Sequence, residues 1–290
     1  MTADTRLLSS QSFRTALMKA LILTVFTAVS LVVLFPLLAL VISALRPGRD
    51  LMRFGITFDS LFAGDKSMRN FYDLFFAPRA TYGYWFKNSL MITAVQTISS
   101  VFLTSLVGYG LAVYNFKGRN LLITLVLILM MVPLQILILP LYKLMIGLNL
   151  MDKMAGVILP FLLSPVAIFF FRQFCLGLPL ELMDAARIDG VTELGIYFRI
   201  MTPLMLPAFG AMGILVGLQS WNNYLWPLIV LRTTRNFTIP IGLNSKLTPY
   251  GNNYEVLISG SVVAIIPIVV LFIFFQKYFV SGLSSGSLKG

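Results

Sequence analysis

The side chains best able to do chemistry lie in a polar stretch of an otherwise very apolar chain. Within residues 179–190 and 198–203, the charged members are Glu181, Asp184, Arg187, Asp189 and Arg199. Long apolar runs flank the stretch and contain no Asp or Glu, which disfavours an enzyme embedded in a membrane. The chain also has no His, the commonest metal ligand and proton shuttle. The charges are therefore suited to pairing with another protein rather than to catalysis, and no metal site is predicted.

The spacing in this stretch predicts two short helices joined by a turn. Pro179 suits the first turn of a helix, where its missing N–H costs nothing. The two acids that follow it are favoured by the helix dipole. Gly190 is a natural stop, so residues 179–189 should form about three helical turns. Thr192 can cap a second helix that runs to Met201.

One face of the first helix indicates a docking surface. Leu182, Ala185, Ala186 and Asp189 share that face by i, i+3, i+4, i+7 spacing, and the two alanines leave it shallow. The charged side chains around it are Glu181, Asp184 and Arg187. The alternative is an amphipathic helix that lies on lipid headgroups, but such helices favour Lys and Arg on their polar face. Three acids and one Arg favour docking of another protein.

The composition of the chain outside the polar stretch is typical of a membrane protein. Of 290 residues, 58% are hydrophobic and 11% are charged, against about 25% charged in soluble domains. A single cysteine excludes an intrachain disulfide. The net charge is +11, but basic residues near a membrane usually meet anionic lipid, and no compact basic domain is present to hold nucleic acid. Membrane lipid is therefore an expected partner, and nucleic acid is not.

Charge-free runs predict an all-α polytopic membrane protein, because a helix needs about 20 apolar residues to cross a bilayer. The six predicted spans are residues 21–45, 88–116, 121–142, 154–171, 204–229 and 256–276. The first is too long for a cleavable signal peptide. The polar loop 172–203 separates the fourth and fifth spans, and residues 1–290 are expected to form one transmembrane domain. Six spans place both termini on one side, but the 22 Lys and Arg residues divide too evenly to say which.

The polar loop resembles the signature of membrane subunits of ABC importers, which has the form E-A-A-x-x-x-G followed by I-x-L-P. Residues 184–190 read D-A-A-R-I-D-G and residues 200–203 read I-M-T-P. Asp184 keeps the charge of the signature glutamate on a shorter arm, and Thr202 stands where leucine is usual. Further segments at 221–228 and 276–290 look like the carbohydrate-uptake branch, in particular its maltose-type second permease subunit. The resemblance covers roughly residues 85–290.

This resemblance implies a mode of action. In the family the loop is cytoplasmic and enters a cleft of an ATP-binding subunit. By this resemblance, both termini would lie in the cytoplasm. The chain would be a multi-pass protein of a bacterial cytoplasmic (inner) membrane. The implied partners are a second, different permease subunit, two ATP-binding subunits and a periplasmic or extracellular solute-binding protein. The chain has no G-x-x-x-x-G-K-S/T loop, so it is expected to be no enzyme and to bind no cofactor, with ATP and Mg²⁺ on the partner subunits. The residues expected to couple transport to ATP are Glu181, Asp184, Ala185, Ala186, Arg187, Asp189 and Gly190.

The expected substrate is a carbohydrate. Trp221, Asn222, Asn223 and Tyr224 lie late in the fifth apolar run, where rings could stack on a sugar and amides could bond its hydroxyls. An interfacial aromatic belt is the alternative. The loops opposite the termini carry net positive charge, which favours an acidic oligosaccharide or anchors the loops to lipid. The alternative functions are an ABC permease for glycerol-phosphate-like or other polar solutes, and a passive channel, which would not need the acidic loop.

Overall fold

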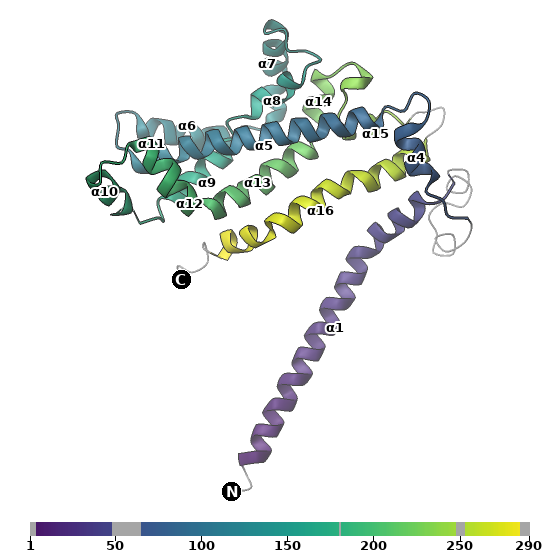
Figure 1. Ribbon diagram of the computed structural model, residues 1–290, viewed down its shortest axis with the longest axis horizontal. Coiled ribbons are helices and arrows are strands. Elements are labelled where there is room, and N and C mark those ends of the chain that lie inside the picture. The colour runs from purple at the N-terminus through teal and green to yellow at the C-terminus, as the bar shows by residue number, and fades with distance from the viewer. Residues whose placement is uncertain (1–3, 48–64, 180, 248–252, 285–290) are drawn as a thin grey trace. The chain divides into compact units, whose positions relative to one another are not determined.

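The computed structural model describes residues 4–47, 65–179, 181–247 and 253–284, and all regular structure in these ranges is helical (Figure 1). Three stretches are each long and apolar enough to cross a membrane: Arg14–Ala44, Tyr82–Val113 and Tyr254–Phe274. Three further pairs of helices pass the same test together but are bent within the pair. The predicted all-α membrane fold is confirmed, and three straight helices with three bent pairs agree with six spans.

The chain divides into two compact units, residues 1–73 with 253–262 and residues 74–252 with 263–290. In the first unit, α1 (Asp4–Ala44) ends against the start of α4 (Arg69–Phe76). The Asn70 amide donates hydrogen bonds to the carbonyls of Ala44 and Arg46 at 2.8 and 2.7 Å. These bonds satisfy carbonyls that a helix end leaves without a partner. The predicted single domain over residues 1–290 stays a prediction.

Three helices form the body of the second unit. They are α5 (Tyr82–Val113), α9 (Pro165–Cys175) and α13 (Leu206–Trp221), and α5 packs along both of the others (Figure 1). A Cβ atom placed on Gly108 of α5 would lie 2.6 Å from the Cβ of Phe171 and 2.9 Å from the carbonyl oxygen of Ile168, both in α9. Small residues at such crossings let membrane helices approach closely. The two helices therefore meet where only glycine fits.

Replacing Gly108 by alanine should destabilise this body. The new methyl group would collide with backbone and Cβ atoms that cannot rotate away, so the helices must separate, and overpacking of this kind costs about 1–3 kcal/mol. Gly110→Ala is the matched control, because nothing lies within 4 Å of a Cβ built at Gly110 and alanine is the better helix former. Thermal unfolding of the purified protein in detergent compares the two. Equal midpoints would contradict the close crossing.

Prolines determine where the predicted spans bend. The run at 121–142 forms two helices, α6 (Arg119–Met131) and α7 (Leu134–Gly147), which are bent by 104°. The break falls at Val132 and Pro133, which both have extended backbone. Proline lacks an N–H and disfavours helix in the residue before it. The pairs within residues 154–175 and 193–221 are bent by 43° and 76°.

The remaining helices are short or lie at the C-terminus. They are α8 (Met154–Ile158), η1 (Leu159–Phe161), α10 (Glu181–Ile188), α11 (Glu193–Ile196), η2 (Tyr197–Met201), α12 (Thr202–Leu204), α14 (Leu225–Val230), η3 (Thr234–Asn236), α15 (Ile239–Asn244) and α16 (Tyr254–Ser284). α10 begins at Glu181 rather than at the predicted Pro179, and Leu180 lies outside the described residues. The end of the C-terminal segment that carries the family resemblance, residues 285–290, also lies outside them.

The two ends of α5 carry different attachments. α5 has 32 residues and is therefore about 48 Å long. α10 and α11 lie at its C-terminal end, and α15 lies at its N-terminal end (Figure 1). There the Trp85 indole N–H donates to the carbonyl of Thr234, and the Ser89 hydroxyl accepts from the N–H of Ile239, both at 2.8 Å. The polar loop and the loop that carries α15 thus lie at opposite ends of the body.

Candidate functional site

The polar loop folds into a helical hairpin with glycine at its turn. Gly190 has φ 77°, and the N–H groups of Gly190 and Val191 donate to carbonyls in the last turn of α10, each at 3.0 Å. This is the Schellman motif that ends helices on a left-handed residue. The hydroxyl of Thr192 accepts a hydrogen bond from the N–H of Gly195 at 3.2 Å and so caps α11. The predicted stop at Gly190 and cap at Thr192 are confirmed.

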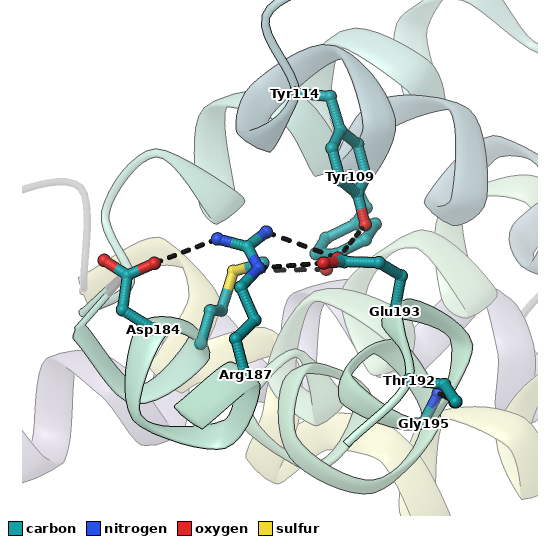
Figure 2. A network of polar contacts seen from close by, with 8 residues as sticks. Tyr109, Tyr114, Asp184, Arg187, Thr192, Glu193 and Gly195 are labelled. Carbon is teal, nitrogen blue, oxygen red and sulfur yellow. Dashed lines mark hydrogen bonds and ion pairs between the residues drawn. The ribbon is translucent and has the colours of Figure 1, made fainter. Parts of the chain in front are cut away.

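One arginine joins the two helices of the hairpin (Figure 2). The Arg187 guanidinium bonds Asp184 Oδ1 at 2.9 Å within α10, and Glu193 Oε1 at 2.8 Å at the start of α11. The Tyr114 hydroxyl, just beyond α5, donates to Glu193 Oε2 at 2.6 Å. The bonds from Arg187, and then the bond from Tyr114, lower the pKa of Glu193, so this loop carboxylate is ionised at neutral pH. The network orients the hairpin on the end of α5. It adds little stability, because the ion pairs are exposed to solvent.

The inner face of α10 packs on the body, and this corrects one predicted docking residue. Met183 and Ala186 are 1% and 5% exposed and belong to the core cluster that contains Tyr109 and Tyr197. The small Ala186 side chain therefore lets α10 lie close to its own core, not close to a partner. Leu182, Ala185, Ala186 and Asp189 do not form one exposed face, because the body covers Ala186.

The exposed surface of the hairpin includes apolar side chains that the sequence reasoning missed. Ile188 is 87% exposed and Leu194 is 68% exposed. A hollow of about 490 Å³ beside the turn is lined by residues that include Gly190, Leu194 and Arg199. The predicted coupling residues that are exposed here are Glu181, Asp184, Ala185, Arg187, Asp189 and Gly190. Apolar side chains exposed among charged ones are typical of a protein contact. In the sequence, Ile188 between the charged residues Arg187 and Asp189 could have indicated this contact.

The hairpin continues directly into the body. Residues Tyr197–Met201 form the π-helix η2, a feature often found at functional sites. The Tyr197 and Ser105 hydroxyls are hydrogen-bonded at 2.7 Å, and the Tyr197 ring lies 5.2 Å from the ring of Tyr109. α12 then leads into α13. The hairpin is therefore in direct contact with α5 and continuous with α13.

A second feature is a cavity of about 440 Å³, lined by Gln96 of α5, by Val216 and Gln219 of α13, and by residues within 160–165 and 222–225 among others. Its polar lining residues are Gln96, Ser164, Gln219, Asn222, Asn223 and Tyr224. The other lining residues are apolar, and none of the described lining residues is charged. Three of the four predicted path residues thus lie together, at the break between α13 and α14. The sequence reasoning missed Gln96, Ser164 and Gln219. The available signal for Gln96 was an amide side chain within the apolar run 88–116.

Trp221, the fourth predicted path residue, does not line this cavity. Its indole N–H donates to the carbonyl of Ala264 in α16 at 3.1 Å, and its ring meets Phe86 edge to face at 6.1 Å. Trp221 is the last residue of α13, so its side chain points to a different side from the residues of the following break. It packs helices together rather than facing the cavity.

The cavity residues differ in how far their polar groups are engaged. The Tyr224 hydroxyl donates to Asn244 Oδ1, and the Asn222 amide donates to the carbonyl of Leu218, both at 3.0 Å. The side chain of Asn223 makes no hydrogen bond to a described residue. The cavity therefore offers amide groups to a polar ligand while its walls are mainly apolar, as in many ligand sites.

Residues 100–285, which include the hairpin and the break between α13 and α14, match the family of binding-protein-dependent transport system inner membrane components. The chain belongs to this family. The transport component is 56% identical over 267 residues to the arabinooligosaccharides transport system permease protein AraQ of Bacillus subtilis (strain 168), with 91% of this chain and 94% of that protein covered. It is 33% identical over 256 residues to the lactose transport system permease protein LacG of Rhizobium radiobacter, with 88% and 91% covered.

The fold of the transport component is also similar to a crystal structure of a bacterial ABC transporter involved in the import of the acidic polysaccharide alginate. The TM-score is 0.76 over 93% of this chain and 98% of that chain, at 20% sequence identity. This likeness supports the fold alone. The family match confirms the resemblance of the polar loop and places the transport component in an inner membrane.

Proposed function

We propose that this chain is the permease subunit of an ABC importer for oligosaccharides, in which it forms half of the translocation path. The observation that carries the proposal is one body with two sites. An exposed, partly apolar hairpin lies at the end of α5, and Gln96 of the same helix lines an uncharged cavity that also contains amide side chains from other segments. Hydrolysis of ATP on partner subunits would move the hairpin, and the contacts of Tyr197 and Tyr114 would pass this motion to the helices around the cavity. A passive channel would need only the cavity.

The relatives and the cavity chemistry support a neutral sugar. Both named relatives are permeases for sugars, and arabinose and lactose carry no ionised group. The described residues that line the cavity include amides and a tyrosine but no Lys or Arg, which a phosphate or carboxylate group would be expected to meet. The net positive charge of the loops favours an acidic oligosaccharide or a glycerol phosphate, but the described cavity lining offers such a solute no cation, so a neutral sugar is better supported.

The assembly we propose follows from the two ends of α5. The hairpin end and both termini face the cytoplasm, and the hairpin enters a cleft of one of two ATP-binding subunits. Those subunits hold ATP and Mg²⁺. This chain itself is no enzyme and binds no cofactor. The opposite end, with α15, faces a solute-binding protein. A second, different permease subunit completes the path. The exposed apolar residues Ile188 and Leu194 support a protein contact at the hairpin end.

Reconstitution tests this proposal. The complete importer in proteoliposomes, with its solute-binding protein outside and ATP inside, should accumulate labelled arabinotriose. Glycerol 3-phosphate should not be accumulated, because the described cavity lining offers it no cation. A non-hydrolysable ATP analogue is the control and should stop uptake. Equal uptake without ATP would favour a channel, and uptake of glycerol 3-phosphate alone would favour the other class of importer.

A further inference from the structure

We propose that Gln96 forms a hydroxyl-binding subsite in the cavity and that Ser220 positions it. This inference deepens the proposed function and rests on it, because the ligand would be a hydroxyl group of a passing oligosaccharide. Neither residue belongs to the hairpin or to the segment 221–224 that the sequence points to. They come from two different helices, α5 and α13, and the fold brings them together.

Gln96 is buried, yet it faces the cavity. Gln96 is only 5% exposed, and it is one of the residues that line the cavity. It lies 14 positions after Tyr82, the first residue of the 32-residue helix α5, which places it about 21 Å along that helix. Gln96 therefore lies near the midpoint of α5, where a sugar that crosses the membrane beside this helix could meet it.

Ser220 holds one end of the Gln96 amide. The Ser220 hydroxyl, in a residue 7% exposed, donates a hydrogen bond to Gln96 Oε1 at 3.1 Å. The last torsion of a glutamine side chain is otherwise broad and nearly two-fold. With the carbonyl oxygen bonded to Ser220, the amide has one preferred orientation. The NH₂ end is then directed away from Ser220.

The NH₂ end is the part left for a ligand. Among the described residues, Gln96 Nε2 donates no hydrogen bond, and it is not one of the polar atoms that the fold encloses without a partner, so it is open to the cavity. An amide N–H donor can bond a sugar hydroxyl oxygen, and apolar lining residues such as Phe161 and Pro160 can contact the C–H faces of the ring. An uncharged donor suits a substrate that must be released again, because a charged pair would bind more strongly.

Four variants test the subsite in the reconstituted importer. Gln96→Met keeps the length of the side chain and removes the amide, Ser220→Ala removes the positioning bond, and the double variant combines them. Gln276→Met is the matched control, because Gln276 is exposed in α16 and does not line the cavity. Arabinotriose uptake and ATP hydrolysis stimulated by the solute-binding protein are measured together, so that transport per ATP can be compared.

We expect Gln96→Met to lower arabinotriose uptake per ATP about tenfold, the effect of losing one hydrogen bond of ordinary strength, while stimulated ATP hydrolysis is retained. Ser220→Ala should give a smaller loss and should add nothing to Gln96→Met, because residues that act through one another are not additive. Gln276→Met should match the unmodified chain. If Gln96→Met does not assemble, Gln96→Leu, which also lacks the amide, should show the same loss.

The outcomes separate the two proposals. An importer with the unmodified chain that moves no arabinotriose would show that the proposed function is wrong. Suppose that the unmodified chain takes up arabinotriose normally. Unchanged uptake per ATP in Gln96→Met or Gln96→Leu would then overturn the subsite and leave the proposed function standing. Additive losses in the double variant would show that Ser220 does not act through Gln96.

Discussion

Gly190→Val should abolish uptake while the importer still assembles in the membrane. Gly190 has φ 77°, a conformation that costs an ordinary residue about 1–2 kcal/mol and is least accessible to a β-branched one. Nothing lies within 4 Å of a Cβ atom built there, so the substitution creates no clash inside the chain. Its effect is confined to the turn that sets the angle between α10 and α11. Uptake of arabinotriose and co-purification of the partner subunits measure the two expectations.

Gly190→Asn is the matched control, because asparagine tolerates the left-handed conformation. If the geometry of the turn is what coupling needs, the Asn variant should retain most uptake and only the Val variant should lose it. If the partner subunit packs against the open space beside Gly190, both variants should lose it, because both side chains fill that space. Normal uptake by Gly190→Val would remove the hairpin from the coupling mechanism.

Features that depend on neighbouring residues in the chain could be predicted from the sequence. The stop at Gly190 and the cap at Thr192 follow from backbone hydrogen bonding within a few residues, and both are confirmed. The apolar runs also mark the membrane helices, because crossing a bilayer requires length and hydrophobicity alone. Pro133 indicates a break in the run 121–142, but the angle of 104° depends on what α6 and α7 pack against.

Features that depend on distant parts of the chain could not be predicted. Spacing on α10 places Ala186 on the same face as Leu182, but only the packing of α10 on the core cluster of the body decides that Ala186 is covered. In the same way, Trp221 and Asn222 are adjacent in sequence, yet one contacts α16 and the other lines the cavity. Gln96 stands out in the sequence as an amide in an apolar run, but its partner Ser220, 124 positions away, is found only in the fold.

Gly242→Ala should have the largest effect on stability. A Cβ atom at Gly242 would lie 2.1 Å from Cδ2 and 2.2 Å from Cε3 of the Trp85 ring. That ring is fully buried, and its N–H is bonded to the carbonyl of Thr234, so it cannot move aside without losing the bond. The cost should lie at or above the upper end of the roughly 1–3 kcal/mol typical of overpacking. We expect an unfolding midpoint in detergent lower by roughly 5 °C or more.

Two further variants attribute this effect to the ring contact. Gly213→Ala is the control, since nothing lies within 4 Å of a Cβ built there, and it should leave the midpoint unchanged or raise it. Trp85→Leu alone should lower the midpoint, because a large buried side chain and its hydrogen bond are lost. Combined with Gly242→Ala it should cost less than the sum of the two single changes, since the atoms that clash are gone. Strict additivity would show that this contact does not hold α15 against the start of α5. The end of the body that we propose to face the solute-binding protein would then need another anchor.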